Sequence, residues 1–383
     1  MLWENPTLQG WLLLVFARVR VYQEVNMIML AWGKNTRDSG NASQPYSFAR
    51  APKKAIAEAR KKVATAINAD PEEIFFTSGG TESDNWAIKG IAFSCVQKKK
   101  TITSEIEHHA ILNACGALEG LGYPVSYIKP DKEGIISPQM LESVIDDNTG
   151  LVSIMFSNNE IGTIEPIKEL AAVAHQHGSL FHTDAVQAVG HISIDVKELG
   201  VDMLSASAHK FNGPKGIGFL YVKKGTQIKP FNDGGSQEFG MRAGTENVAS
   251  IVGMATALEK NANLIDQNEK YLLQLEARLV NILDRSGIDY VRNGAAKHVP
   301  GNMSLSFNGK DGEALLHRLD LQGICVSTGS ACDSKNTQIS HVLKAIELEE
   351  KYAKGTIRVS LGKDNTKEDV DKIGNVLLSM LSE

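Results

Sequence analysis

The chain carries the stretch Ser205-Ala206-Ser207-Ala208-His209-Lys210, in which a lysine closes a short apolar run. Upstream of it, Phe181-His182-Thr183-Asp184 is a second apolar run, and this one ends in an acid. An aspartate and a lysine at the ends of two neighbouring strands are what a pyridoxal phosphate enzyme requires, because the carboxylate keeps the pyridine nitrogen protonated and the amine forms a Schiff base. Taken alone, the pair is weak evidence, because a lysine after a strand is usually a solvated loop end and an aspartate there is often a helix cap.

Strand and helix patterns alternate around these two runs from residue 50 onward. Helical patterns such as 109–119 and 166–177 separate short apolar runs that are typical of strands. The predicted strands are 74–76, 101–104, 125–128, 151–156, 180–183, 203–205 and 218–222. This order predicts an α/β fold with a mostly parallel seven-stranded sheet and helices on both faces.

The pattern changes after residue 246. The stretch 246–285 is helical almost throughout, with a break near 261–264. Beyond it, strand-like runs at 290–291, 303–307, 325–327 and 357–361 lie between helical patterns at 311–319, 338–346 and 366–382. A chain of 383 residues exceeds the usual size of a single core. We therefore predict a divergent segment at 1–22, a large domain at 23–260 and a small α+β domain at 261–383.

A glycine pair marks a candidate phosphate site in the first half of the chain. Thr77-Ser78-Gly79-Gly80-Thr81-Glu82-Ser83 follows an apolar run and opens a helical pattern. Glycines let the backbone approach an anion, and the amides at the start of a helix point toward it. An ordinary Gly-Gly turn with Ser78 or Thr81 as the helix cap is the alternative. The motif is neither a P-loop nor a dinucleotide fingerprint.

With these motifs and several others in the same order, the chain resembles the cysteine desulfurases of the NifS/IscS type. These enzymes are class V aminotransferase relatives with the type I fold of pyridoxal phosphate enzymes. The resemblance begins near residue 23 and extends to the C-terminus. Besides the three stretches quoted above, it rests on Glu107-His108, Asn158-Asn159-Glu160-Ile161-Gly162, Asp184 to Gln187, Arg242-Ala243-Gly244-Thr245, Ser330-Ala331-Cys332 and Ile357-Arg358-Val359-Ser360.

The resemblance implies a pyridoxal 5'-phosphate site. In it, Lys210 forms the covalent link, Asp184 pairs with the ring nitrogen, and His108 stacks on the ring and carries protons. The remaining implied cofactor contacts are Gly80, Thr81, Asn159, Gln187, Ser207, His209 and Thr245. The threonine that matches Thr245 comes from the partner subunit in this family, which implies a homodimer. Structural roles in loops and caps are the alternative for these polar residues.

The resemblance also implies a substrate and a sulfur acceptor on the enzyme. Arg358, with Asn159 near it, is expected to bind the α-carboxylate of L-cysteine, although an arginine in a strand often faces outward. Cys332 lies in a small polar loop and is expected to attack the substrate sulfur, which leaves a persulfide on Cys332 and L-alanine as co-product. We predict that Cys325 is a core residue on the strand before this loop.

Composition narrows the cellular setting. The net charge of -5 gives no basic field for direct nucleic-acid binding. The four cysteines form no Cys-x-x-Cys pair, which argues against zinc and indicates a reducing cytoplasm. The apolar run at 11–16 is too short to span a membrane. We therefore expect a cytoplasmic enzyme without a metal.

The sequence leaves three functions open. The first is a cysteine desulfurase that passes sulfur to an acceptor protein, such as an iron–sulfur scaffold or a thiolation enzyme. The second is a selenocysteine lyase or class V aminotransferase that uses the same lysine. The third is a catalytically silent paralogue that binds a scaffold partner, because residues 1–22 lack the family's opening segment.

Overall fold

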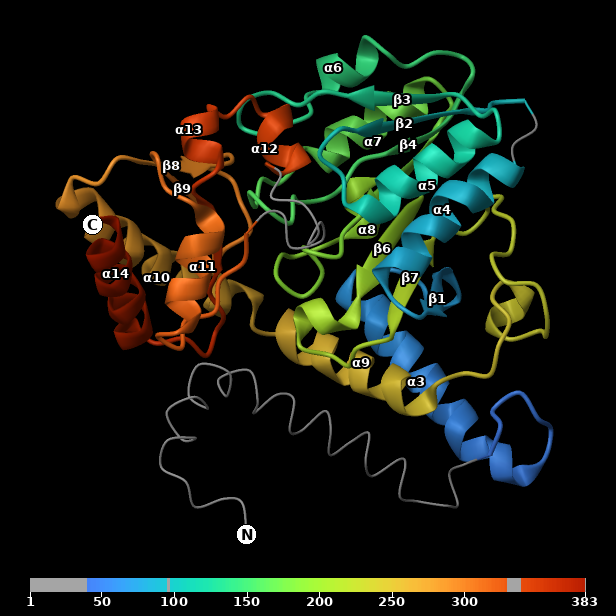
Figure 1. The fold of residues 1–383 in the computed structure, drawn as a ribbon. Coiled ribbons are helices and arrows are strands. Elements are labelled where there is room, and N and C mark those ends of the chain that lie inside the picture. Colours follow the sequence, from blue (N-terminus) through green and yellow to red (C-terminus); the bar gives the residue numbers. More distant parts are fainter. Residues whose placement is uncertain (1–39, 95–96, 329–338, 383) are drawn as a thin grey trace.

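A computed structural model describes residues 40–94, 97–328 and 339–382 of the chain. These residues form two sheets, one of seven strands and one of three, each covered by helices (Figure 1). The expected α/β fold of the type I class is confirmed. Residues 1–22 and Cys332 lie outside the described residues, and the domain limits of 23–260 and 261–383 stay a proposal.

The large sheet has the strand order β1-β7-β6-β5-β4-β2-β3. Its strands are β1 (Ile74–Thr77), β2 (Lys100–Ser104), β3 (Val125–Ile128), β4 (Thr149–Ser153), β5 (Leu180–Asp184), β6 (Met203–Ser207) and β7 (Gly218–Val222). Only β7 is antiparallel to its neighbours, so β1 to β6 run in one direction. The carboxyl ends of these six strands therefore meet at one edge of the sheet.

Helices cover both faces because alternate residues of each strand point to opposite sides. In β6, Met203 packs toward the helices α4 (Gly80–Ser94) and α5 (His109–Gly120), whereas Leu204 packs toward the opposite layer. The helices of that opposite layer and its margins are α3 (Arg50–Ala66), α6 (Pro138–Glu142), α7 (Ile167–Gln176), α8 (Val196–Leu199) and α9 (Val248–Ala262). Short 3-10 helices lie at η2 (Ser47–Ala49), η3 (Pro71–Glu73), η4 (Ala208–Phe211) and η5 (Glu238–Gly240).

The second sheet has its own hydrophobic core. Its antiparallel strands follow the order β10-β9-β8 and are β8 (Tyr290–Asn293), β9 (Asn302–Phe307) and β10 (Thr356–Ser360). The helices of this part are α10 (Ile265–Ser286), α11 (Gly312–Asp320), α12 (His341–Ala345), α13 (Glu350–Ala353) and α14 (Lys367–Leu381). Leu279 of α10 and Leu377 of α14 are both fully buried in its core.

Two predictions about residues 325–327 are wrong. These residues form no strand, because only Ser327 reaches β10, in an isolated bridge with Arg358. The Ser327 amide donates to the Arg358 carbonyl at 3.1 Å, and the Arg358 amide donates back at 2.6 Å. Cys325, which we expected in the core, is exposed. The chain runs along the open edge of β10 there, where Val326 packs against the core of the small sheet and Cys325 is exposed.

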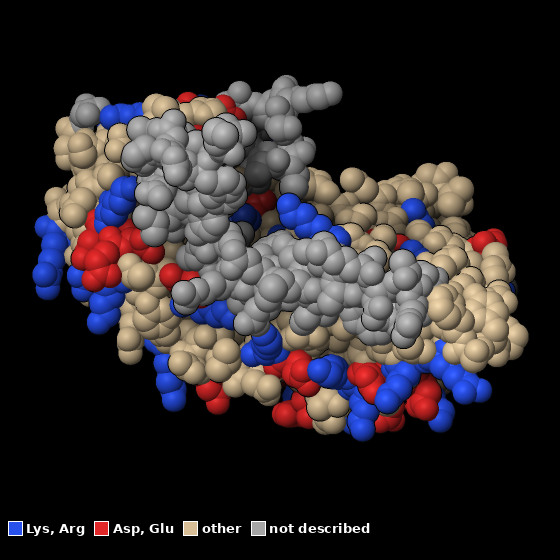
Figure 2. Space-filling model, turned by 90° about the horizontal axis from the view of Figure 1, so that it is seen from below, with Lys and Arg blue, Asp and Glu red and all other residues tan. Residues whose placement is uncertain are grey.

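The surface agrees with the modest net charge of the chain. On the face seen in Figure 2, acidic and basic side chains lie interspersed, and neither sign gathers into a broad field. In the described part of the chain, no helix is long and apolar enough to cross a membrane.

Candidate active site

The expected site residues gather at the carboxyl edge of the large sheet. Asp184 ends β5, and the neighbouring parallel strand β6 ends at Ser207, three residues before Lys210 in η4. His108 follows β2 and Asn159 follows β4, whose carboxyl ends lie at the same edge. Residues far apart in the sequence thus converge because parallel strands end together.

The turn between β1 and α4 comes close to the ends of β5 and β6. Gly79 has a φ of 149°, and a Cβ at that position would lie 3.6 Å from Ser207 Oγ. A Cβ on Gly80 would lie only 2.6 Å from Val186 Cγ2. Any larger residue at Gly80 would therefore push the start of α4 away from the loop after Asp184. Thr81, at the first turn of α4, is exposed beside this contact.

Lys210 and Asp184 interact electrostatically. Asp184 is 5 % exposed, and its Oδ1 accepts a hydrogen bond from the Val186 amide at 2.9 Å. Burial raises the pKa of Asp184 to about 6, although that hydrogen bond and the positive charge of Lys210 act in the opposite direction. A cationic ring nitrogen placed next to Asp184 would stabilise the carboxylate further.

His108 begins α5 and caps it. Its Nδ1 accepts a hydrogen bond from the Ala110 amide at 3.1 Å, which orients the ring. Burial lowers the pKa of His108, and the charges of His109, Lys210 and His341 lower it further. The imidazole is therefore uncharged at neutral pH, and because Nδ1 accepts from the Ala110 amide, its proton is on Nε2.

The other expected cofactor contacts lie along the same edge. Ser207 is buried, and its Oγ lies 3.0 Å from Nδ1 of the exposed His209. Gln187 is half-buried in the turn that follows Asp184. Thr245 is exposed and lines a small pocket on the Ser78 side of the glycine turn.

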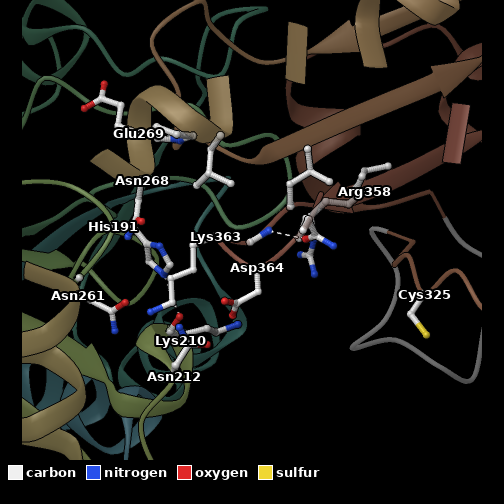
Figure 3. A pocket seen from close by; sticks show the side chains of 18 of the residues that line it. His191, Lys210, Asn212, Asn261, Asn268, Glu269, Cys325, Arg358, Lys363 and Asp364 are labelled. Carbon is white, nitrogen blue, oxygen red and sulfur yellow. Dashed lines mark hydrogen bonds between the residues drawn. The ribbon is translucent and has the colours of Figure 1, made fainter. Parts of the chain in front are cut away.

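Arg358 approaches this edge from the small sheet. Its Nη1 donates a hydrogen bond to the Asn159 carbonyl at 2.7 Å, which joins β10 to the loop after β4. Lys210 and Arg358 both line a pocket of about 420 Å³ between the two parts of the molecule (Figure 3). Cys325 lines the margin of the same pocket, and its side chain stands apart from Lys210.

Three further groups lie beneath the site and were not recognised in the sequence. Asp84 and Glu107 are buried acids: burial raises the pKa of Glu107 to about 8 and raises that of Asp84 well above its usual value, and the charge of Asp184 adds to both effects. His182 lies between the hydroxyls of Ser153 and Ser205, each 2.9 Å away, and burial lowers its pKa to about 3. His182 and Asp184 are two residues apart on one face of β5, and this polar alternation was the available signal.

In the described residues no group of three or more His, Cys, Asp or Glu side chains is arranged to hold a metal ion. Lys210, the carboxyl groups, His108 and Arg358 are the ionisable groups that the described site offers.

Comparison with known proteins shows the protein family to which the chain belongs. The family model described as aminotransferase class-V matches residues 28–373. The chain is also 48% identical over 362 residues to a protein from Methanosarcina thermophila named cysteine desulfurase IscS, which covers 94% of this chain and 89% of that protein.

Solved structures support the same assignment. A structure titled NifS-like protein superposes with a TM-score of 0.87 at 36% identity and covers 94% of this chain and 95% of the other. A structure titled SspA in complex with cysteine reaches a TM-score of 0.78 at 37% identity and covers 89% and 95%. The chain belongs to the class V aminotransferase family, within its cysteine desulfurase branch.

Proposed function

We propose that this protein is a homodimeric, cytoplasmic, pyridoxal phosphate-dependent cysteine desulfurase. The observation that carries the proposal is the electrostatic contact between Lys210 and buried Asp184 at the ends of adjacent parallel strands. The names of the 48%-identical relative and of the cysteine complex support sulfur removal from L-cysteine as the reaction.

The residues present fit the cofactor. Asp184 offers a buried carboxylate to a ring nitrogen, and Lys210 offers the amine that links the cofactor. The close approach at Gly79 and Gly80, with Thr81, Ser207 and His209 nearby, suits a phosphate. Thr245 of the partner subunit completes this phosphate seat. Gln187 and Asn159 would hold the ring oxygen, and His108 would stack on the ring.

When bound, pyridoxal phosphate supplies an electron sink for the bonding electrons released at the α-carbon of an amino acid. Arg358 binds the α-carboxylate, because its planar guanidinium forms a bidentate pair with a carboxylate. Lys210 takes and returns the α-proton, and neutral His108 carries a second proton. Together these groups orient the amino acid and move the protons that cleavage of its Cβ–S bond requires.

Cys332 accepts that sulfur. Its thiolate attacks the substrate sulfur, so an S–S bond forms while the Cβ–S bond breaks and its electron pair passes to the carbon skeleton. The carbon takes up a proton and leaves as L-alanine, and the persulfide on Cys332 is then passed to an acceptor protein. An iron–sulfur scaffold and a thiolation enzyme are the two kinds of acceptor that we propose.

The product pattern of the purified chain tests this function. With pyridoxal phosphate and L-cysteine, we expect a visible absorption band and equal amounts of alanine and sulfide in the presence of a thiol reductant. Activity with selenocysteine but not with cysteine would favour a selenocysteine lyase. A 2-oxo acid product would favour an aminotransferase, and a colourless, inactive protein would favour a silent paralogue.

A further inference from the structure

Two of the sequence motifs contain a charged residue that the proposed cofactor site does not use. Glu82 follows Thr81 in the glycine motif, and Arg242 precedes Thr245 in the other. These two side chains form a bidentate pair: Arg242 Nε lies 2.8 Å from Glu82 Oε1, and Arg242 Nη2 lies 3.1 Å from Glu82 Oε2. The Glu82 side chain is 10% exposed and that of Arg242 is 21% exposed.

Glu82 also closes the glycine turn. Its Oε2 accepts a hydrogen bond from the Ser78 amide at 2.9 Å, so the carboxylate spans Gly79, Gly80 and Thr81. Burial alone would raise the pKa of Glu82, but the hydrogen bonds from Arg242 and Ser78 bring it below its usual value. The carboxylate is therefore ionised, and its charge is balanced by Arg242.

The loop that carries Arg242 is fastened at a second point. Glu238 of η5 accepts hydrogen bonds from both terminal nitrogens of Arg60, each at 2.8 Å, and from the Phe76 amide at 2.9 Å. Phe76 lies in β1, directly before the glycine turn. The Arg242–Glu82 pair and the hydrogen bond from the Phe76 amide to Glu238 thus attach the loop of residues 238–245 to residues 76–82. The Arg60 pair joins the same loop to α3.

We propose that the Glu82–Arg242 pair is a positioning element of the phosphate seat, which joins the glycine turn of a chain to the loop that carries Thr245. The proposal rests on the proposed function. Without Arg242, an ionised carboxylate would stand one residue after Thr81 and repel a phosphate group. With it, the turn is neutral and is held at both ends. Because Thr245 serves the partner subunit, the pair also links the two phosphate seats of the dimer.

The affinities of the apoprotein for pyridoxal phosphate and for pyridoxal test this role. Arg242→Gln should weaken pyridoxal phosphate binding by at least about tenfold, since it removes a charged bidentate pair beside the phosphate. Pyridoxal has no phosphate, so its affinity should change by less than about twofold. Unchanged pyridoxal phosphate binding, or an equal loss for both compounds, would overturn the proposal.

Arg242→Lys guards against a folding defect, because it keeps the charge but loses the bidentate geometry. Its affinity for pyridoxal phosphate should lie between those of the wild type and Arg242→Gln, whereas a wild-type value would contradict a positioning role. Arg278→Gln is the matched control: it breaks the bidentate pair with Asp371, at 2.5 and 2.6 Å, far from the site, and should leave both affinities unchanged. If the wild type itself bound both compounds equally, the phosphate seat would be refuted rather than the pair.

Discussion

The two sheets of this protein contribute to the site in different ways. The large sheet places Asp184, Ser207, Lys210 and His108 at the ends of strands that share one direction. The small sheet contributes one described charged group, Arg358, which reaches across to the Asn159 carbonyl. The proposed cofactor groups therefore lie on a buried framework, whereas Arg358, the proposed carboxylate-binding group, lies on a part with a separate core. Cofactor binding and substrate binding should accordingly respond to different mutations.

The largest loss of activity is expected from a substitution in the large part of the molecule. Lys210→Ala removes both the cofactor link and the group that moves the α-proton, so alanine formation should fall by roughly a thousandfold or more. Chromatographic measurement of alanine from cysteine checks this result. Lys215→Ala, at an exposed lysine of the same loop, should behave like the wild type. Full activity in Lys210→Ala would end the assignment.

Arg358→Ala should distinguish the contribution of the small part to substrate binding from the contribution of the large part to cofactor binding. Loss of the carboxylate contact should lower kcat/KM for L-cysteine by about tenfold to a hundredfold, mainly through KM, while cofactor affinity stays near the wild-type value. Steady-state kinetics and a cofactor titration measure the two quantities. If cofactor affinity fell as much as kcat/KM, the comparison between the two parts would be wrong.

The buried carboxylate of the large part predicts a pH dependence. The pKa of Asp184 is raised to about 6, so its negative charge is present above that pH and is lost as the pH falls through it. Affinity of the apoprotein for pyridoxal phosphate should therefore decrease below pH 6, by at most about tenfold per pH unit. Asp184→Asn should bind weakly and lack this step. A step of the same size in Asp184→Asn would assign it to another group.

The smallest effect concerns the junction between the two parts. Glu276 of α10 lies 2.8 Å from His298 Nε2 and 2.7 Å from Arg292 Nη2. The pair with Glu276 raises the pKa of His298 above 6.5, so its stabilisation is complete below that pH and disappears as the pH rises through the raised value. Glu276→Gln should lower the free energy of unfolding by about 1 kcal/mol near pH 6, where Glu276 is ionised and His298 is protonated, and by less as the pH rises. Chemical denaturation at several pH values measures this difference, and a loss of the same size at every pH would contradict this account.

The sequence predicted the large sheet well because its strands are short apolar runs separated by helical patterns. The runs at 125–128 and 218–222 match β3 and β7 in both bounds. The stretch 325–327 misled us, because three apolar or small residues indicate a strand regardless of which edge they run along. Cys325 is exposed because the segment 325–327 runs along the outer edge of β10. The sequence does not show that this strand lies at the edge of its sheet.

The sequence predicted those site residues whose side-chain type has a specific chemical role. It did not predict residues whose effect depends on the groups packed around them. Asp184 and Lys210 stand at strand ends, so the sequence indicated that they meet. Asp84 was overlooked, and Glu107 was given no role of its own, because an acid near a helix start is usually a cap and the burial of both follows from tertiary packing. The pairing of Glu82 with Arg242 likewise depends on a loop whose path the sequence does not indicate.

The most direct test of the central claim is the location of the persulfide after reaction with L-cysteine. The protein is incubated with pyridoxal phosphate and cysteine, alkylated, digested and analysed by mass spectrometry. The account predicts one added sulfur on Cys332, its absence in Cys332→Ser together with loss of alanine formation, and wild-type behaviour in Cys325→Ser. A persulfide on Cys325, or alanine and sulfide formed by Cys332→Ser at the wild-type rate, would contradict it.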